Sequence, residues 1–237
     1  MKKRILYTVI SVFVLFLAGC EYDNYDPPTS ILSGNVHYNN VPVGVRSGGT
    51  QLELWQYDWD SRGIIARAKI VVNIDQNGFY SSRLYDGDYK LVRLKGGPWA
   101  DQTDSIDVKV SGNTTVDVPV TPFYVITNPT FTLSGNEITS TCNITKVGMA
   151  DITSLTLYVG VTNIVDANNN GKQFVTLRES DLTDLSSVKT IKLTLDIDKL
   201  VKDHPAWTRN HIYVRLGVLS NGSTERYYTP VQKIMLH

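Results

Sequence analysis

Three aromatic residues recur at every second position in one short segment, a pattern that could bind a saccharide. A regular strand would place Trp55, Tyr57 and Trp59 on one face, because successive side chains point to opposite faces of a strand. Leu52 and Leu54 would then lie on the other face. Flat rings beside polar groups can stack on a sugar ring and bind its hydroxyls. Two interpretations stay open: the rings form an exposed saccharide platform, or they cover the seam with a neighbouring domain.

A fourth candidate contact residue, Trp99, follows the sequence G-G-P in an expected loop at residues 95–104. Loops often carry binding residues, so this Trp is a candidate sugar contact. The alternative is that it folds back as a lid on the end of its domain. Simple up-and-down alternation of strands places the loops that carry Trp59 and Trp99 at opposite ends of the domain, so we expect no single site that uses both.

The remaining chemistry-bearing residues offer little for catalysis. The four histidines lie in no H-E-x-x-H pattern and beside no plausible Ser or Cys nucleophile; they are His37, His204, His211 and His237. We therefore predict that the protein is not an enzyme and uses no cofactor or metal. A hydrolase stays as a third hypothesis, which the release of reducing ends from a polysaccharide would support.

Residues 166–171 read D-A-N-N-N-G and match the first half of a calcium-binding loop. Such a loop has a bidentate Glu at its twelfth position, where this chain has Leu177, and Glu179 comes two residues late. Asn and Gly also favour plain turns between strands. We therefore predict an ordinary loop here rather than a metal site.

Length and charge limit the classes of partner. A chain of 237 residues with 42% hydrophobic residues suits two globular domains. Its formal net charge is zero, and removal of residues 1–19, which hold three bases and no acid, leaves 20 bases against 23 acids. Such a chain does not attract nucleic acid electrostatically. Of the two cysteines, Cys20 has a separate role below, so Cys142 is predicted to be a buried small hydrophobic residue.

The N-terminus predicts export and lipidation. Residues 1–19 combine a basic start with an apolar run too short to span a bilayer, which is typical of a signal peptide. The run ends L-A-G before Cys20, which resembles the bacterial lipobox, so we expect a lipid on Cys20 that anchors the protein to the membrane. Residues 20–30, with three acids and two prolines, are predicted to be an extended tether.

The acids that follow Cys20 resemble the surface-export signal of Bacteroidetes lipoproteins. This resemblance implies an outer-membrane protein that faces the cell exterior. The alternative is a solvated linker on a protein that faces the periplasm.

Two β-sandwich domains are predicted after the tether. Residues 31–121 show short alternating strands separated by turns, with no helical pattern. One of the expected strands covers residues 114–120. The segments 32–36 (L-S-G-N-V), 74–79 (I-D-Q-N-G-F) and 84–89 (L-Y-D-G-D-Y), followed by 108–119, resemble the carboxypeptidase-regulatory, transthyretin-like sandwich. These motifs mark turns and core positions, so they imply a fold and no chemistry.

Residues 122–237 show a second β pattern. Strands are expected at residues 131–133, 138–144, 155–165, 190–197, 212–218 and 226–234. A helical turn is expected at residues 198–204, before Pro205, and the dipeptide Asn221-Gly222 favours a hairpin. The pattern is typical of an immunoglobulin-like or fibronectin-III-like sandwich that lacks the Cys pair of true immunoglobulin domains. The predicted fold class is therefore all-β, with two tandem β-sandwiches.

The order of signal, acidic tether and two sandwiches resembles a family of two-domain Bacteroidetes surface lipoproteins of unknown function, encoded beside Sus-type (starch-utilisation-type) glycan importers. The resemblance implies a non-catalytic accessory role in glycan capture or uptake, either by glycan binding or by docking on an import complex. We expect Trp55, Tyr57, Trp59 and Trp99 to contact the polysaccharide. The alternative is a structural or adhesive subunit of the kind found in fimbria-like lipoproteins.

Overall fold

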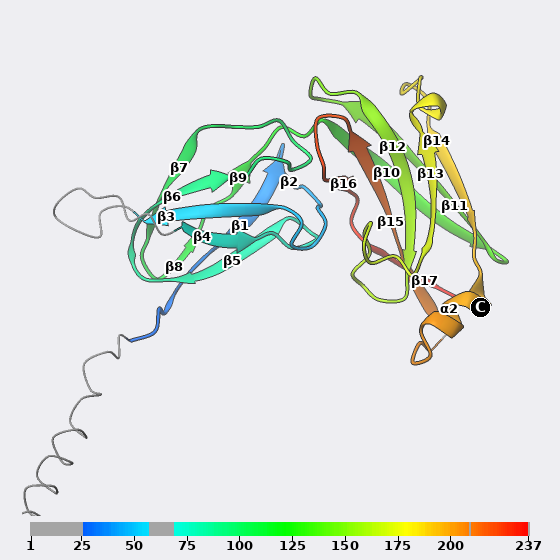
Figure 1. Cartoon of the computed structure of the whole chain (residues 1–237), viewed down its shortest axis with the longest axis horizontal. Helices are drawn as coiled ribbons and strands as arrows, with labels where there is room; N and C mark the ends of the chain where they lie inside the picture. The colour runs from blue at the N-terminus through cyan, green and yellow to red at the C-terminus, as the bar shows by residue number, and fades with distance from the viewer. Residues whose placement is uncertain (1–25, 57–68, 209, 237) are drawn as a thin grey trace, which may run out of the picture.

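The protein folds into two β-sandwiches in tandem, which confirms the predicted all-β class (Figure 1). The structure is a computed structural model and describes residues 26–56, 69–208 and 210–236. Within those residues, no helix is long and apolar enough to cross a membrane.

The first domain packs two sheets against each other. One sheet has the strand order β2-β1-β5, with β8 and β9 also paired to β1, and the other has the order β4-β3-β6-β7. The pairing is antiparallel except that β8 and β9 run parallel to β1. The strands are β1 (Ser30–Tyr38), β2 (Val41–Pro42), β3 (Gln51–Gln56), β4 (Lys69–Asn73), β5 (Phe79–Leu84), β6 (Gly87–Arg93), β7 (Ser105–Val110), β8 (Asn113–Thr115) and β9 (Val118–Pro119).

The strand expected at residues 114–120 is divided into β8 and β9, and the cause is a close approach of the backbone to β1. A Cβ atom on Gly34 would lie 1.8 Å from the carbonyl oxygen of Val116, so only glycine fits at this position. The Tyr80 hydroxyl donates to the same carbonyl at 2.6 Å. Val118 and Val120 are buried as predicted, whereas Val116 is only half-buried.

The second domain also packs two sheets. Their strand orders are β10-β11-β14 and β13-β12-β15-β16, with β17 also paired to β15. The elements are β10 (Tyr124–Ser134), β11 (Glu137–Lys146), β12 (Ile152–Gly160), β13 (Gln173–Arg178), the 3₁₀ turn η1 (Glu179–Asp181), β14 (Lys189–Thr194), α2 (Ile197–Asp203), β15 (His211–Ser220), β16 (Tyr227–Tyr228) and β17 (Gln232–Met235).

Two differences from the sequence-based expectation matter for the site. The strand expected at residues 155–165 ends at Gly160, and the chain continues as a loop to residue 172. The edge strand β13, which follows this loop, was not predicted, and its Phe174 side chain is 53% exposed. The helical turn before Pro205 is confirmed as α2, whose N-cap residue Asp196 accepts a hydrogen bond from the backbone N–H of Lys199 at 2.9 Å.

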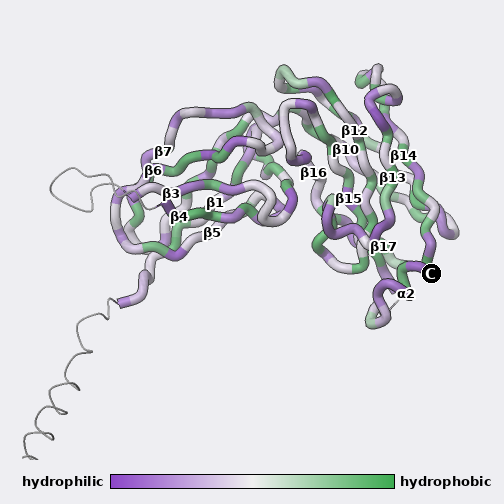
Figure 2. Tube along the Cα trace, viewed as in Figure 1, coloured by the Kyte–Doolittle hydropathy of each residue, from purple (hydrophilic) through white to green (hydrophobic). Residues whose placement is uncertain are grey.

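Apolar and polar residues alternate along the strands (Figure 2). The buried apolar side chains form a hydrophobic cluster with members from both domains. Cys142 belongs to this cluster and is 1% exposed, as predicted. Burial raises the pKa of its thiol to about 11, so the side chain behaves as a small hydrophobe.

Candidate functional site

Of the three residues in the predicted aromatic platform, the structure describes only Trp55. Trp55, in β3, is half-buried and stands opposite Lys69 of β4 and Lys90 of β6. Leu52 and Leu54 are fully buried, so the leucine face points inward and Trp55 lies on the outer face of the sheet. Tyr57 and Trp59 lie outside the described residues, so an aromatic stripe at this place stays a prediction.

Trp99 is not a sugar contact, because its indole ring is 2% exposed and has no free face. The ring covers Gly97, where a Cβ atom would lie 2.5 Å from Cε2 of Trp99. Trp99 also forms an isolated β-bridge with Pro122. The loop therefore folds back at the junction of the domains, which is the lid arrangement that the sequence left open.

The residues best placed to bind a small molecule lie instead in the second domain. Two adjoining pockets, of about 460 Å³ and about 510 Å³, share Val161, Thr162, Asp203 and His204 in their walls. Their walls come from the loop between β12 and β13, the end of α2 and the segment that leads into β15. We call the two pockets together the groove. Asp203, the last residue of α2, lines both pockets. The helix α2 lies at one end of the second domain (Figure 1).

One wall of the groove is the Asn-rich loop, residues 161–172. Asp166 is fully buried, and its Oδ1 accepts hydrogen bonds from the backbone N–H groups of Asn168 at 2.8 Å and Asn169 at 2.9 Å. The Asn170 side chain donates to the carbonyl of Ala167 at 2.8 Å. Asp166 and Asn170 therefore close the loop on itself, as the turn interpretation predicted, and leave Asn168 exposed at the groove.

The opposite wall is built by the end of α2 and by Trp207. The C-cap residue of the helix is His204, and its side chain lines both pockets because Pro205 turns the chain away directly after it. The indole N–H of Trp207 donates to the carbonyl of His211 at 2.8 Å, and the half-buried ring packs on the core. The tryptophan is therefore held in place while part of its surface faces the second pocket.

The groove offers apolar surface together with amide, imidazole and hydroxyl groups. Its one carboxylate side chain, among the described lining residues, is Asp203, which forms an ion pair with Lys199 at 2.9 Å. The hydrogen bond from Lys199 lowers the pKa of Asp203 below its ordinary value. In the described parts of the chain, no three His, Cys, Asp or Glu side chains are grouped to hold a metal ion. The arrangement suits binding of a polar ligand with a flat apolar face, such as a sugar.

The sequence patterns identified neither Trp207 nor Asn168 as a binding residue. His204 and His211 were considered only as metal ligands or catalytic groups, yet both line the second pocket. The available signal was a run of three Asn and a Trp shortly after a helix-ending Pro. Nothing local to either segment shows that they meet, because about thirty-five residues of chain separate them.

Comparison with known proteins agrees with the two-domain organisation. Residues 30–121 match the model of the N-terminal domain of a protein of unknown function (DUF3823), and residues 124–233 match the DUF3823_C domain of unknown function. No curated protein matches the chain. Because both models describe domains of unknown function, no catalytic family is indicated.

Solved structures show the same arrangement. A DUF3823 family protein from Bacteroides ovatus is 32% identical with a TM-score of 0.76, and the match covers 88% of this chain and 100% of that one. A DUF3823 family protein from Parabacteroides merdae is 26% identical with a TM-score of 0.75 over the same shares of the two chains. A "putative carbohydrate binding protein" from Bacteroides uniformis is 17% identical with a TM-score of 0.67, again over 88% and 100%. The chain therefore belongs to the DUF3823 family, which confirms the predicted membership of a two-domain Bacteroidetes family of unknown function.

Proposed function

We propose that the protein is a non-catalytic, lipid-anchored surface protein that is accessory to glycan capture, and that it binds a saccharide in the groove of the second domain. The observation that carries the proposal is the half-buried Trp207, fixed in a pocket that His204 and His211 also line and that adjoins the pocket lined by the Asn-rich loop. A fixed aromatic surface with hydrogen-bonding groups around it is the arrangement that recognises a pyranose ring. The Bacteroides uniformis structure described above is named for the same ligand class.

The cellular part of the proposal rests on the sequence. The lipobox-like segment before Cys20 and the acidic tether after it support a lipid anchor and display on the outer surface. Labelling of the wild type with a fatty-acid analogue, lost in Cys20→Ser, would support the anchor. Protection of the protein from added protease on intact cells would contradict surface display.

Binding is tested with residues 28–237 on an immobilised panel of starch, laminarin, arabinoxylan, galactomannan, polygalacturonate and chondroitin sulfate. The groove variants are Asn168→Ala and His204→Ala, because both residues line the groove and neither side chain belongs to the core. Asn113→Ala, at an exposed position of the first domain, is the matched control. Loss of one hydrogen bond predicts affinity about five- to tenfold weaker in each groove variant and unchanged affinity in the control.

Trp55→Ala separates the groove from the outer face of the first domain. If this variant loses binding while the groove variants keep it, the saccharide site lies on the predicted platform with Trp55, Tyr57 and Trp59. If no polysaccharide binds, the glycan-binding proposal fails. Docking on an import complex, or a structural role, is then the function to test by co-purification from outer membranes.

A further inference from the structure

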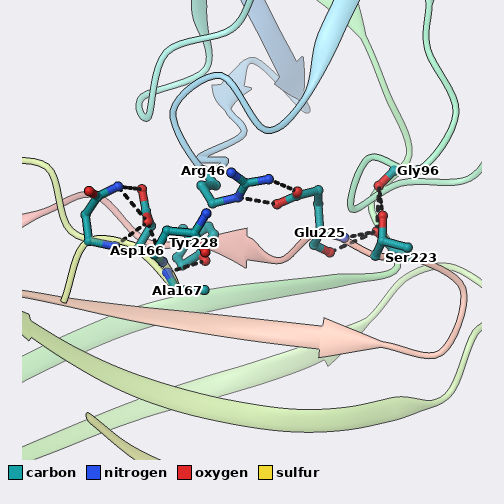
Figure 3. A network of polar contacts seen from close by, with 10 residues as sticks. Arg46, Gly96, Asp166, Ala167, Ser223, Glu225 and Tyr228 are labelled. Atoms are coloured by element: carbon teal, nitrogen blue, oxygen red, sulfur yellow. Dashed lines mark hydrogen bonds and ion pairs between the residues drawn. The ribbon is translucent and has the colours of Figure 1, made fainter. Parts of the chain in front are cut away.

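The Asn-rich loop has a second set of contacts, on the side away from the groove, and these come from the interface between the domains. The side-chain amide of Gln76, in a turn of the first domain, donates to the carbonyl of Asn163 at 2.7 Å. The backbone N–H of Ala167 donates to the hydroxyl of Tyr228 at 3.1 Å (Figure 3). Tyr228 in turn donates its backbone N–H to the carbonyl of Gly44, in the first domain, at 2.9 Å. The loop is therefore fastened to the interface at two points.

Arg215 makes the third attachment of the Asn-rich loop, and it joins the loop to the first domain. Its side chain is fully buried, and its guanidinium lies over the ring of Tyr228, 4.5 Å from the centroid. Nη1 donates to the carbonyl of Val165 in the loop at 3.3 Å and to that of Val45 in the first domain at 3.2 Å. Nη2 donates to the carbonyl of Gln76. One buried side chain thus binds the groove loop and two segments of the first domain together.

These attachments follow a regular order along the loop. Asn163, Val165 and Ala167 bind the interface through their backbones, and the next residue, Asn168, is the first of the run that lines the groove. The Val165 side chain is fully buried and packs with Tyr228. The backbone position of the groove wall is therefore set by contacts from the opposite side of the same loop.

We infer that the first domain positions the ligand groove of the second domain, with Gln76 and Arg215 as positioning residues that act through the Asn-rich loop. The part of this inference that concerns ligand affinity rests on the proposed saccharide site. The physical reason is preorganisation, because a wall held in its bound geometry loses less conformational entropy when a ligand binds. By linkage, a ligand in the groove then strengthens the contact between the domains to the same extent.

The attachment itself is tested without a ligand, by hydrogen–deuterium exchange of residues 161–172 in the protein 28–237. Gln76→Ala removes the bond to Asn163, and Gln76→Glu keeps the shape but places a carboxylate, which cannot donate, against the Asn163 carbonyl. Gln51→Ala is the control, since it removes a comparable exposed side-chain bond, to Asn73 at 2.8 Å, away from the groove. We expect exchange in the loop to be about fivefold faster in both Gln76 variants and unchanged in the control.

The second arm measures affinity for the same six polysaccharides and the melting temperature of each variant. Weaker binding by both Gln76 variants at an unchanged melting temperature supports positioning, because loss of fold would lower both. Loop exchange within twofold of wild type overturns the attachment, and faster exchange with unchanged affinity overturns the positioning of the groove. If no polysaccharide binds to wild type, the proposed function fails, while the exchange data still decide whether the first domain holds the loop. Arg215→Lys adds a larger perturbation, but the outcome does not depend on its folding.

Discussion

Replacement of Arg215 by methionine is predicted to destabilise the protein strongly, although it removes a buried charge that is costly to bury. The guanidinium is fully buried and donates to four backbone carbonyls, among them Thr229 at 2.6 Å and Val45 at 3.2 Å. Burial lowers the pKa of Arg215 to about 10, which leaves the side chain protonated at neutral pH. The charge is thus held by carbonyl dipoles and by the ring of Tyr228, and no carboxylate of the described residues forms an ion pair with it.

The magnitude follows from two opposing terms. A hydrogen bond from a charged donor contributes ~1.5–3 kcal/mol, so four of them exceed the several kcal/mol that it costs to desolvate the ion. Methionine fills a similar volume but leaves the buried carbonyls without their donor, and we expect a loss of about 3 kcal/mol in the free energy of unfolding. For a chain of this size that loss lowers the melting temperature by ~6–12 °C.

The assay is urea unfolding of residues 28–237 followed by tryptophan fluorescence. Arg46→Ala is the comparison variant, because Arg46 also joins the domains, through its bidentate ion pair with Glu225 (Figure 3). That pair is partly exposed, with side-chain exposures of 26% and 14%, so solvent screening limits its loss to about 1 kcal/mol. A loss below about 1 kcal/mol in Arg215→Met would refute the reasoning. It would show that desolvation of the guanidinium cancels its hydrogen bonds.

Three further predictions concern single positions. Gly44→Ala should lower the melting temperature, because the added Cβ would lie 2.4 Å from the carbonyl oxygen of Tyr228 and force the domains apart; an unchanged thermal transition would contradict this. Cys142 should resist a thiol reagent at pH 8 in the native protein and react once urea unfolds it, since burial raises the pKa of its thiol to about 11. Rapid labelling of the native protein would contradict this, because it would show that the thiol is accessible. The pKa of Asp86 should lie below 3.8, because Ser30 Oγ and Gly112 N–H donate to its carboxylate. The stability that these bonds contribute is therefore fully present above pH 3.8 and is lost as the pH falls through the folded-state pKa. An NMR titration of the carboxyl group checks this, and Ser30→Ala should move the midpoint back toward 3.8.

Local sequence patterns predicted most of the fold because each strand carries its own signal. In β3 the alternation buries Leu52 and Leu54 and places Trp55 on the outer face, and these three residues are enough to recognise it. The exceptions have causes that lie elsewhere in the chain. The strand at residues 114–120 is divided where its backbone meets Gly34 of β1, and such a contact leaves no trace in the alternation of Val116 and its neighbours.

The groove could not be predicted for a similar reason. Its walls meet only in the folded domain, and each wall resembles something ordinary when viewed alone. The run at residues 168–170 has the composition of a turn, and Trp207 has the appearance of a core aromatic. For Trp99 the sequence left two alternatives open, a sugar contact or a lid on the end of its domain, and the tertiary structure buries it at the domain junction. For aromatic residues outside strands, the surrounding fold decides exposure, and residue type and local context do not.

The attachment between the domains also bears on how the groove would be presented at a membrane. The described chain begins at Asp26, whose carbonyl accepts a hydrogen bond from the Tyr85 hydroxyl at 2.7 Å, so the tether leaves from the first domain. The groove lies on the second domain, and a flexible junction would let it take any orientation relative to the first domain. Arg215 and the pair of Arg46 with Glu225 remove that freedom. On the proposed lipid anchoring, the first domain therefore acts both as the support that holds the groove loop and as a rigid spacer between the groove and the tether.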